Sequence, residues 1–186
     1  MRKVTAFIGE KATLLAIYNE IKGQVSADIY CKNGMSELKV EITDYVKAIA
    51  LGSEVVRKNG LNHVAWISPC GSPIARFSDT ATETAKKVES GIMPAFTSLS
   101  AIEIQRVAKR LDDVNIGAIA TTDEKGYWQI VVKPEEYLEA VAIGAKFIDG
   151  CNLKNVVWND PTGVNRFNME SLARTARTEL DDVLEA

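Results

Sequence analysis

The sequence predicts an α+β protein built from two copies of one unit, residues 1–92 and 93–186, packed as one globular body. Three observations support this prediction: an octamer recurs 92 residues later, two further blocks recur in the same order, and turn signals separate short apolar runs. Self-similarity at a nearly constant offset is typical of a repeated structural unit. Strands joined by tight turns run antiparallel, so the predicted class is α+β with antiparallel sheets.

The recurring octamer begins at Tyr45 as YVKAIALG and returns at Tyr137 as YLEAVAIG, 92 residues later. The same offset carries a Leu, a Val, a Trp, a Pro and a Gly of residues 61–71 onto residues 153–163. Upstream, an offset of 90 residues matches the apolar positions Leu14, Ile17 and Ile21 with Ile104, Val107 and Leu111. Three separated blocks in one order indicate an internal duplication.

Each unit is expected to run helix, hairpin, helix, hairpin, helix. In the first unit, after a strand over 3–8, we place helix 10–22, hairpin strands 26–31 and 37–42, helix 44–58, hairpin strands 62–68 and 73–78, and helix 79–90. Leu14, Ile17 and Ile21 share one helical face. Asn33-Gly34 is the strongest signal for a two-residue hairpin turn, and Asn59-Gly60 ends the second helix.

The second unit repeats the order with helix 101–112, hairpin strands 114–121 and 127–132, helix 134–147, hairpin strands 154–158 and 164–167, and a final helix from after Asn168 to residue 184. Ser100 and Glu103 form a capping box before the first of these helices. Pro134 stands at the first position of the next helix, where its missing N–H is harmless. We expect one or two antiparallel sheets with helices packed on one face, and a pseudo-twofold relation between the units.

Gly52 and Gly144 occupy the same position in the middle of the two equivalent helices. A glycine inside a helix costs about 1 kcal/mol relative to alanine. Its presence in both copies predicts a contact so close that a side chain would not fit.

Composition places the chain among ordinary globular proteins, with 46% apolar and 25% charged residues. A net charge of −3 argues against a general nucleic-acid binder, which needs a basic surface. No apolar run is long enough to span a membrane, and the apolar run within the first ten residues is too short for a signal peptide. We therefore expect a cytoplasmic protein.

The cysteines Cys31, Cys70 and Cys151 are odd in number and far apart, and His63 is the single histidine. A structural zinc site would need about four such ligands together, so no metal is expected. Reduced thiols in the cytosol are the simple interpretation. No nucleotide-binding or nucleophile-elbow glycine motif occurs, so no cofactor is expected.

Cys70 lies in the Gly/Ser-rich run from Ser68 to Pro73, at the tip of a predicted hairpin, where we expect an exposed thiol. Such a loop can wrap an anion, although its length is also typical of a simple tight turn. His63 lies seven residues earlier, about 20 Å away along an extended strand. A Cys/His catalytic pair is therefore not expected.

Trp66 and Trp158 occupy equivalent strand positions just before the two Pro-x-Gly turns. Each indole either anchors its hairpin in the core or faces a groove between the units and stacks on a ligand. A duplication brings equivalent loops together, where pockets often form. Both interpretations stay open at this point.

Arg76 and Arg166 form a second candidate pair, each one residue before a phenylalanine, Phe77 or Phe167, at a strand end. Their offset of 90 residues suggests a two-residue deletion in the second hairpin. Alternation along a strand predicts that the phenylalanines point inward and the arginines outward. Each arginine then pairs with a nearby carboxylate or offers a forked cation to an anionic ligand.

We expect a non-catalytic binding or assembly protein that uses the sheet face or the seam between repeats to hold a protein partner or a small anionic ligand. The candidate ligand-binding residues are Arg76, Arg166, Trp66 and Trp158, and no catalytic residue is assigned. The alternative is a small enzyme with its site at the seam, where an arginine anchors an anionic substrate and a carboxylate acts as base. A homo-oligomer is compatible with either function. Nucleic-acid binding through the tryptophans and Tyr127 is disfavoured by the acidic charge.

Overall fold

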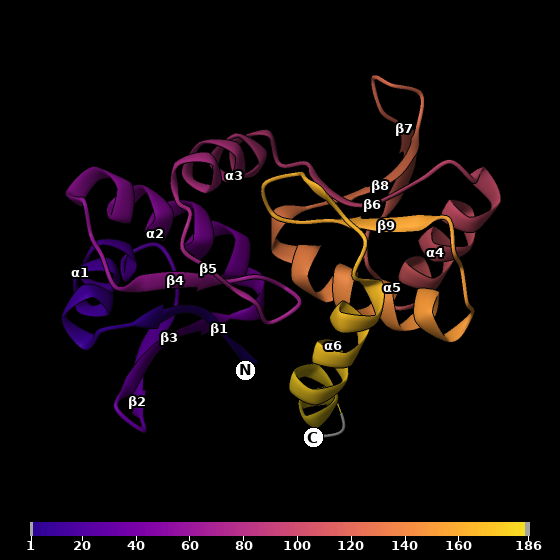
Figure 1. Cartoon of the computed structure of the whole chain (residues 1–186). Coiled ribbons are helices and arrows are strands. Elements are labelled where there is room, and N and C mark those ends of the chain that lie inside the picture. Colours follow the sequence, from indigo (N-terminus) through magenta and orange to yellow (C-terminus); the bar gives the residue numbers. More distant parts are fainter. Residues whose placement is uncertain (1, 185–186) are drawn as a thin grey trace.

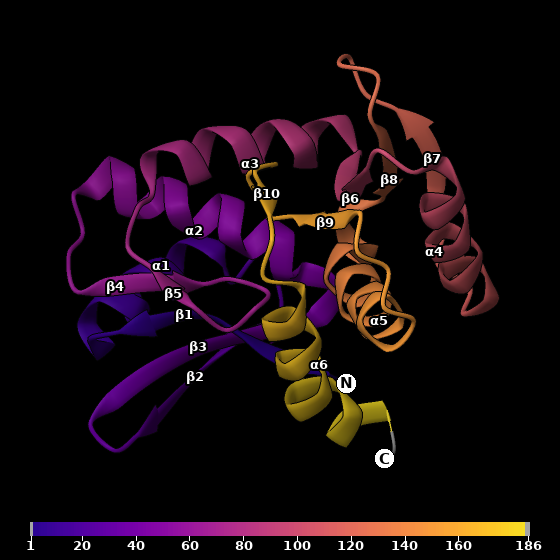
Figure 2. The same ribbon diagram turned by 45° about the vertical axis from the view of Figure 1, so that its right-hand side comes forward.

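The structure is a computed structural model that describes residues 2–184, except for the side chains of Lys32 and of residues 177–184. These residues form six α-helices and two antiparallel five-stranded sheets, which confirms the predicted α+β class (Figures 1 and 2). The predicted repeats begin at residue 1 and end at residue 186, so their outermost positions lie outside the described residues. Within residues 2–184, no helix has the length and apolar character needed to cross a membrane.

The first half begins with a strand and ends with a long helix. Its elements are β1 (Lys3–Gly9), α1 (Lys11–Ile21), β2 (Ala27–Lys32), β3 (Met35–Glu41), the 3₁₀ turn η1 (Ile42–Asp44), α2 (Tyr45–Asn59), β4 (Val64–Ile67), β5 (Pro73–Ile74) and α3 (Ser78–Ser90). The strands pair in the order β2-β3-β1-β4-β5, and each pair is antiparallel. The first strand therefore lies at the centre of the sheet.

The second half repeats this arrangement. Its elements are β6 (Met93–Ser98), α4 (Ala101–Asp113), β7 (Ile119–Thr122), β8 (Trp128–Val132), the 3₁₀ turn η2 (Pro134–Glu136), α5 (Tyr137–Gly150), β9 (Val156–Asn159), β10 (Asn165–Arg166) and α6 (Met169–Leu184). The strand order is β7-β8-β6-β9-β10, which is the order of the first sheet with each strand replaced by its counterpart. The two sheets are thus consistent with an internal duplication.

One strand at the start of the second half was missed. A strand over residues 3–8 was predicted and corresponds to β1, but its counterpart β6 was not predicted, although it occupies the centre of its sheet. The second hairpins are also shorter than expected, since β5 and β10 contain two residues each. In β5 the first residue is Pro73, which has no N–H for a sheet hydrogen bond.

Local backbone features agree with the turn chemistry of the sequence. Asn33 and Gly34 have φ values of 53° and 77°, the left-handed pair that a two-residue hairpin turn requires. Ser100 accepts a hydrogen bond from the Glu103 N–H, which confirms Ser100 as the N-cap of α4. The second bond of the predicted capping box is replaced, because the Ser100 N–H donates to Ser98 Oγ at 2.9 Å. The central strands β1 and β6 both contain an irregularity at equivalent places, just before Phe7 and Phe96.

The core of each half lies between its sheet and its middle helix. Phe7 pairs with Trp66 across β1 and β4, and both side chains are buried. A Cβ built on Gly52 of α2 would lie 2.4 Å from the Phe7 ring, and one on Gly144 of α5 would lie 2.4 Å from the Phe96 ring. The contact-glycine prediction is confirmed. Figure 2 shows α3 running along α2 on the side away from the sheet.

Replacing Gly144 with alanine should destabilise the protein by about 1–3 kcal/mol, because the new methyl group overlaps the Phe96 ring and forces α5 from the sheet. Gly150→Ala is the matched control, since nothing lies within 4 Å of a Cβ built there, at the end of the same helix. Urea unfolding measures the difference. Equal stability of the two variants would show that the α5–β6 contact tolerates a side chain.

Candidate functional site

Two hairpin loops lie at the junction of the halves, residues 68–72 between β4 and β5 and residues 160–164 between β9 and β10. In the first loop, Ser68 N donates to Ser72 O at 2.9 Å. In the second loop, Asp160 N donates to Val164 O at 3.0 Å. The bonded residues lie 92 positions apart in the two loops, so both loops have the same backbone hydrogen bond at the same place.

Each loop is held by the last helix of the other half. Thr84 of α3 donates through its hydroxyl to Pro161 O at 3.4 Å, and Thr175 of α6 donates to Cys70 O at 2.9 Å. Lys87 adds a bond from Nζ to the Thr162 carbonyl at 3.0 Å. The reciprocal contacts fix both loops at the seam.

A pocket of about 270 Å³ lies between the two loops. Its lining comes from both halves and consists of Ser68, Cys70, Ser72, Ile74, Trp158, Asp160, Arg166 and Asn168. Hydroxyl, thiol, amide and guanidinium groups thus border one cavity over two apolar side chains. A second crevice at the seam, next to Tyr45 and Leu138, has a volume of about 20 Å³, which is room for one water and not for a ligand.

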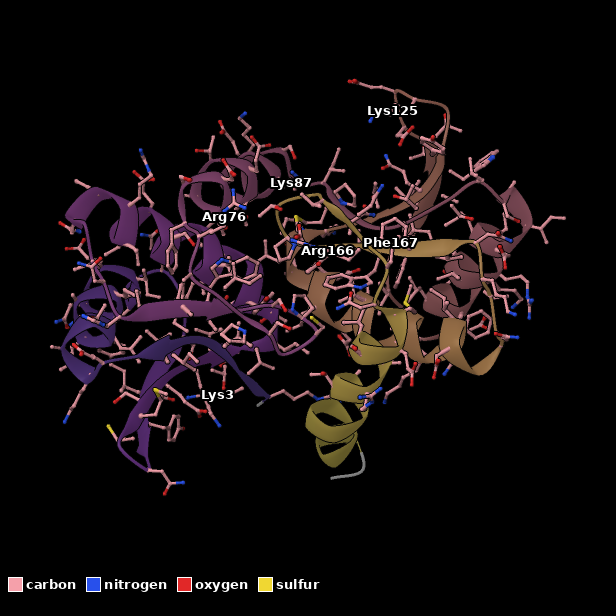
Figure 3. All side chains as sticks on the ribbon, in the orientation of Figure 1. Lys3, Arg76, Lys87, Lys125, Arg166 and Phe167 are labelled. Carbon is pink, nitrogen blue, oxygen red and sulfur yellow. The ribbon has the colours of Figure 1, made fainter. Side chains whose placement is uncertain are left out.

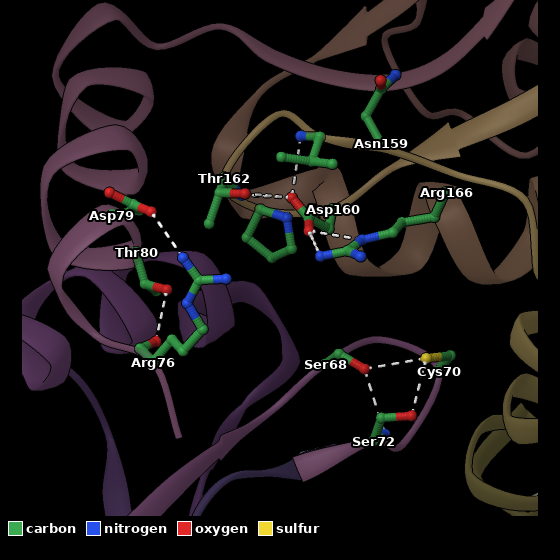
Figure 4. Close-up of polar contacts among 12 residues, drawn as sticks. Ser68, Cys70, Ser72, Arg76, Asp79, Thr80, Asn159, Asp160, Thr162 and Arg166 are labelled. Atoms are coloured by element: carbon green, nitrogen blue, oxygen red, sulfur yellow. Dashed lines mark hydrogen bonds and ion pairs between the residues drawn. The ribbon is translucent and has the colours of Figure 1, made fainter. Parts of the chain in front are cut away.

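The charged part of the seam pocket is the pair formed by Arg166 and Asp160, shown in Figure 4. Asp160 is 2% exposed, and its Oδ2 accepts from Arg166 Nε at 2.9 Å and lies 2.8 Å from Nη2. Its Oδ1 accepts from the backbone N–H groups of Thr162 and Val164 and from the Thr162 hydroxyl. The carboxylate is therefore saturated, while the Arg166 side chain is 46% exposed and keeps further N–H donors for a ligand.

Cys70 provides the thiol of the pocket and is half-buried, not exposed as expected. Its sulfur lies 3.0 Å from Ser68 Oγ and 3.4 Å from Ser72 Oγ (Figure 4). Asn168 Nδ2 also donates to this sulfur, at 3.5 Å. Burial alone would raise the pKa of the Cys70 thiol, but these hydrogen bonds outweigh it and lower the pKa below its ordinary value. His63 is exposed at the other end of β4 and does not accompany the thiol.

The predicted equivalence of Arg76 and Arg166 is wrong. Strand pairing places Ile74 opposite Trp66 and Arg166 opposite Trp158, so Ile74 is the counterpart of Arg166. The β4–β5 and β9–β10 hairpins therefore have equal length. The sequence offset between the two halves changes only after these hairpins, before the helix that follows each of them. Arg76 lies there, 85% exposed, 3.5 Å from Asp79 (Figures 3 and 4).

The phenylalanines beside these arginines also differ from each other. Phe77 is partly buried and packs against the core, as predicted, but Phe167 is 84% exposed. In the second half the strand ends at Arg166 and the chain turns toward α6 at once. The inward-pointing prediction therefore fails for Phe167. Strand alternation applies to neither phenylalanine, because β5 ends at Ile74 and β10 ends at Arg166.

Both tryptophans belong to the core, at 1% exposure each. Trp66 Nε1 donates to Arg76 O at 3.1 Å, and Trp158 Nε1 donates to Asn168 Oδ1 at 2.9 Å. Their burial leaves no ring face on which a ligand could stack. Trp158 still borders the seam pocket, where it positions the Asn168 amide.

Two buried tyrosines support the loops from behind. Tyr45 donates to Ile67 O and Tyr137 donates to Asn159 O, each at 2.6 Å. Burial raises the pKa of the Tyr137 phenol well above its ordinary value, and the nearby Tyr45 and Asp160 act in the same direction. Tyr137 is therefore a neutral hydrogen-bond donor that fixes the end of β9.

Sequence reasoning identified Arg166 but missed Asp160 and Asn168 as parts of the pocket. The sequence contained a signal for Asp160, because an Asp at the first position of an Asp-Pro-Thr-Gly turn commonly accepts hydrogen bonds from backbone N–H groups of the following turn residues. Asn168 had none, since its contact with Cys70 spans 98 residues. Among the described residues, no group of three or more acidic, histidine or cysteine side chains could hold a metal ion.

Comparisons with known proteins add little. No family model matches the chain, and no curated protein matches it. A search of solved structures finds a chain of the "Crystal structure of aspartokinase alpha and beta subunits", at 12% identity, covering 82% of this chain and 99% of that chain. The TM-score is 0.26, and this likeness supports no statement about fold or function.

Tyr137→Phe should lower stability by about 0.5–1.5 kcal/mol at neutral pH, because the Asn159 carbonyl loses its donor. Tyr137 ionises near its ordinary pKa of 10.0 in the unfolded chain and at higher pH in the folded protein, so wild-type stability should fall as the pH rises above 10.0. The variant should lack this part of the alkaline loss. Urea midpoints at several pH values measure both effects. Tyr127→Phe, in the exposed hairpin, is the control and should change neither.

With Cys31 and Cys151 replaced by serine, Cys70 should be alkylated by iodoacetamide at lower pH than an ordinary thiol, because a lowered pKa leaves more thiolate at a given pH. Ser72→Ala removes a hydroxyl 3.4 Å from the sulfur and should move this pH profile upward. Mass spectrometry follows the rate. A profile that Ser72→Ala leaves unmoved would exclude the hydroxyl as a cause.

Proposed function

We propose that the protein is a non-catalytic binding protein whose seam pocket holds a small anionic ligand. The observation that carries this proposal is Arg166, a guanidinium that borders a cavity of about 270 Å³ and is held in place by a buried carboxylate. Two N–H groups of Arg166 point to Asp160, and the remaining ones are available for an oxyanion. A cation that is already oriented loses little conformational freedom when a ligand binds.

Neutral donors complete the proposed anion site. The hydroxyls of Ser68 and Ser72 and the amide of Asn168 border the same cavity. Helix α6 starts at Met169, directly after Asn168, and the N-terminus of a helix carries a partial positive charge. Asp160 offsets the charge of Arg166, so we expect a compact oxyanion recognised by hydrogen bonds at short range and not by long-range attraction.

The alternative function, a small enzyme with its site at the seam, is favoured by one observation. The Cys70 thiol borders the same pocket as Arg166, and its pKa is lowered, as for a reactive nucleophile. A carboxylate base was expected for such an enzyme. The Asp160 carboxylate at the pocket already accepts four hydrogen bonds and forms an ion pair with Arg166. Because these contacts occupy the carboxylate, it is poorly placed to act as a base, which argues for binding over catalysis.

We also infer that the two halves arose by duplication and are related by a pseudo-twofold axis through the seam. Equal strand order, equivalent irregularities in the central strands and matched loops support this. A cytoplasmic location is favoured by the free thiols of Cys31, Cys70 and Cys151. We likewise propose that a protein partner or a second copy of the chain binds to the open sheet faces.

Arg166→Ala should weaken binding of inorganic phosphate by about 10- to 150-fold, because a forked, charge-assisted contact contributes about 1.5–3 kcal/mol. Arg166→Lys should fall between wild type and Arg166→Ala, since lysine keeps the charge beside Asp160 but not the fork. Arg76→Ala is the matched control and should bind like wild type, because Arg76 does not border the pocket.

Isothermal titration at two salt concentrations measures these affinities, after circular dichroism has shown that each variant is folded. A carboxylate probe, acetate, is titrated in the same way. Equal losses in Arg76→Ala and Arg166→Ala, or no binding of either probe to the wild-type protein, would contradict the proposed seam site.

A further inference from the structure

A second pocket, of about 310 Å³, lies on the second sheet between the tip of the β7–β8 hairpin and the β9–β10 hairpin. Lys125 marks the hairpin tip in Figure 3. This groove is bordered by amide and hydroxyl side chains, including Thr97, Gln129, Asn159 and Asn165, together with Tyr127. None of these residues borders the seam pocket.

Strand register explains why these polar side chains share one face. Thr97 pairs with Gln129, and Asn159 pairs with Asn165. Their chain neighbours Phe96 and Trp158 point into the core against α5, so alternation turns the polar residues to the opposite face. A row of uncharged polar groups therefore crosses the sheet from β10 to β8.

The floor of the groove contains a buried amide whose hydrogen bonds are only half made. Asn159 is 2% exposed and Thr97 is 7% exposed. Asn159 Nδ2 donates to Thr97 Oγ1 at 3.0 Å, and the Thr97 hydroxyl lies 3.3 Å from Asn159 Oδ1. Within residues 2–184, no other bond to this side chain is found, which leaves one N–H and one lone pair of the amide. Each polar atom of this amide thus has one partner, and its second N–H and second lone pair are left for a group that enters the groove.

The first half shows that the fold does not need polar groups at these positions. The counterparts of Thr97 and Asn159 are Ile8 and Ile67, as the pairing of Ile8 with Glu37 and of Phe7 with Trp66 shows. The Asn159 carbonyl accepts a hydrogen bond from the Tyr137 hydroxyl, and the Ile67 carbonyl accepts the equivalent bond from Tyr45 in the first half. The polar pair of the second half is therefore explained by something other than folding.

Charge around the groove disfavours an anion. Asp123 Oδ1 accepts from the backbone N–H groups of Lys125 and Tyr127, so this carboxylate is used by its own turn. Glu124 and Lys125 at the tip balance one another. The rim has no excess of positive charge, unlike the seam pocket with Arg166.

We propose that this groove binds a neutral sugar, at the size of a monosaccharide. A sugar hydroxyl donates and accepts at once, which matches the free N–H and lone pair of Asn159 and the amides of Gln129 and Asn165. The Tyr127 ring offers an apolar face for the C–H groups of the sugar and a hydroxyl for its edge. The proposal is independent of anion binding at the seam.

The decisive variant is the double substitution Thr97→Val with Asn159→Leu. Replacing both partners of a buried polar pair with apolar groups of similar shape leaves stability nearly unchanged, and the first half already carries isoleucines there. The variant should melt within a few degrees of wild type and lose sugar binding. Gln129→Ala, at the rim, removes one contact without changing the floor and should weaken binding by about tenfold.

The test is saturation-transfer NMR on the full chain with glucose, galactose, mannose and N-acetylglucosamine, and with inorganic phosphate as the anionic comparator. At least one sugar should show saturation transfer with a dissociation constant of about 1 mM, as expected for a ligand of this size. The signal should disappear in the double variant and persist in Arg166→Ala.

Three results would overturn the proposal. The first is an absence of saturation transfer from all four sugars to the folded wild-type protein, which would assign the spare amide bonds to water. The second is an unchanged sugar signal in the folded double variant. The third is a phosphate affinity that the double variant lowers, because the groove would then bind anions.

Discussion

Each hairpin loop at the junction is bonded to the last helix of the other half. Thr84 of α3 bonds to the Pro161 carbonyl and Thr175 of α6 bonds to the Cys70 carbonyl, so each helix of one half contacts a hairpin loop of the other. Because both contacts end on loop backbone, they set the separation of the two loops. The volume of the seam pocket and the surroundings of Arg166 depend on this reciprocal arrangement.

The same loops are supported from the core by a matched pair of buried tyrosines. Tyr45 and Tyr137 each begin the middle helix of their half, and each donates a hydrogen bond to the last carbonyl of a neighbouring strand. The close contacts at Gly52 and Gly144 bring these helices against their sheets. Packing of glycine on phenylalanine thus positions the tyrosines, and the tyrosines position the loops that border both pockets.

On this common backbone the two halves carry different chemistry. Ser68 and Asp160 each accept from the N–H four residues later, so a hydroxyl and a carboxylate perform the same turn-closing task. The carboxylate also holds Arg166, whereas the equivalent position in the first half is Ile74. One loop therefore supplies charge to the seam pocket and the other supplies a thiol and hydroxyls, which an exactly repeated pair of units could not do.

The sequence by itself determined the α+β class, most helices and hairpins, the Asn33-Gly34 turn and the contact glycines, because side-chain period, turn residues and internal offset are local properties. The tertiary structure decided the burial of the tryptophans, the separate fates of Arg76 and Arg166, and the pairing of Arg166 with Asp160. These depend on strand register and on contacts between residues as far as 105 positions apart. Arg76 lies two residues past the position that corresponds to Arg166, so its side chain lies in solvent and not in the pocket, although both arginines precede a phenylalanine. Only the packing between the halves distinguishes these two positions.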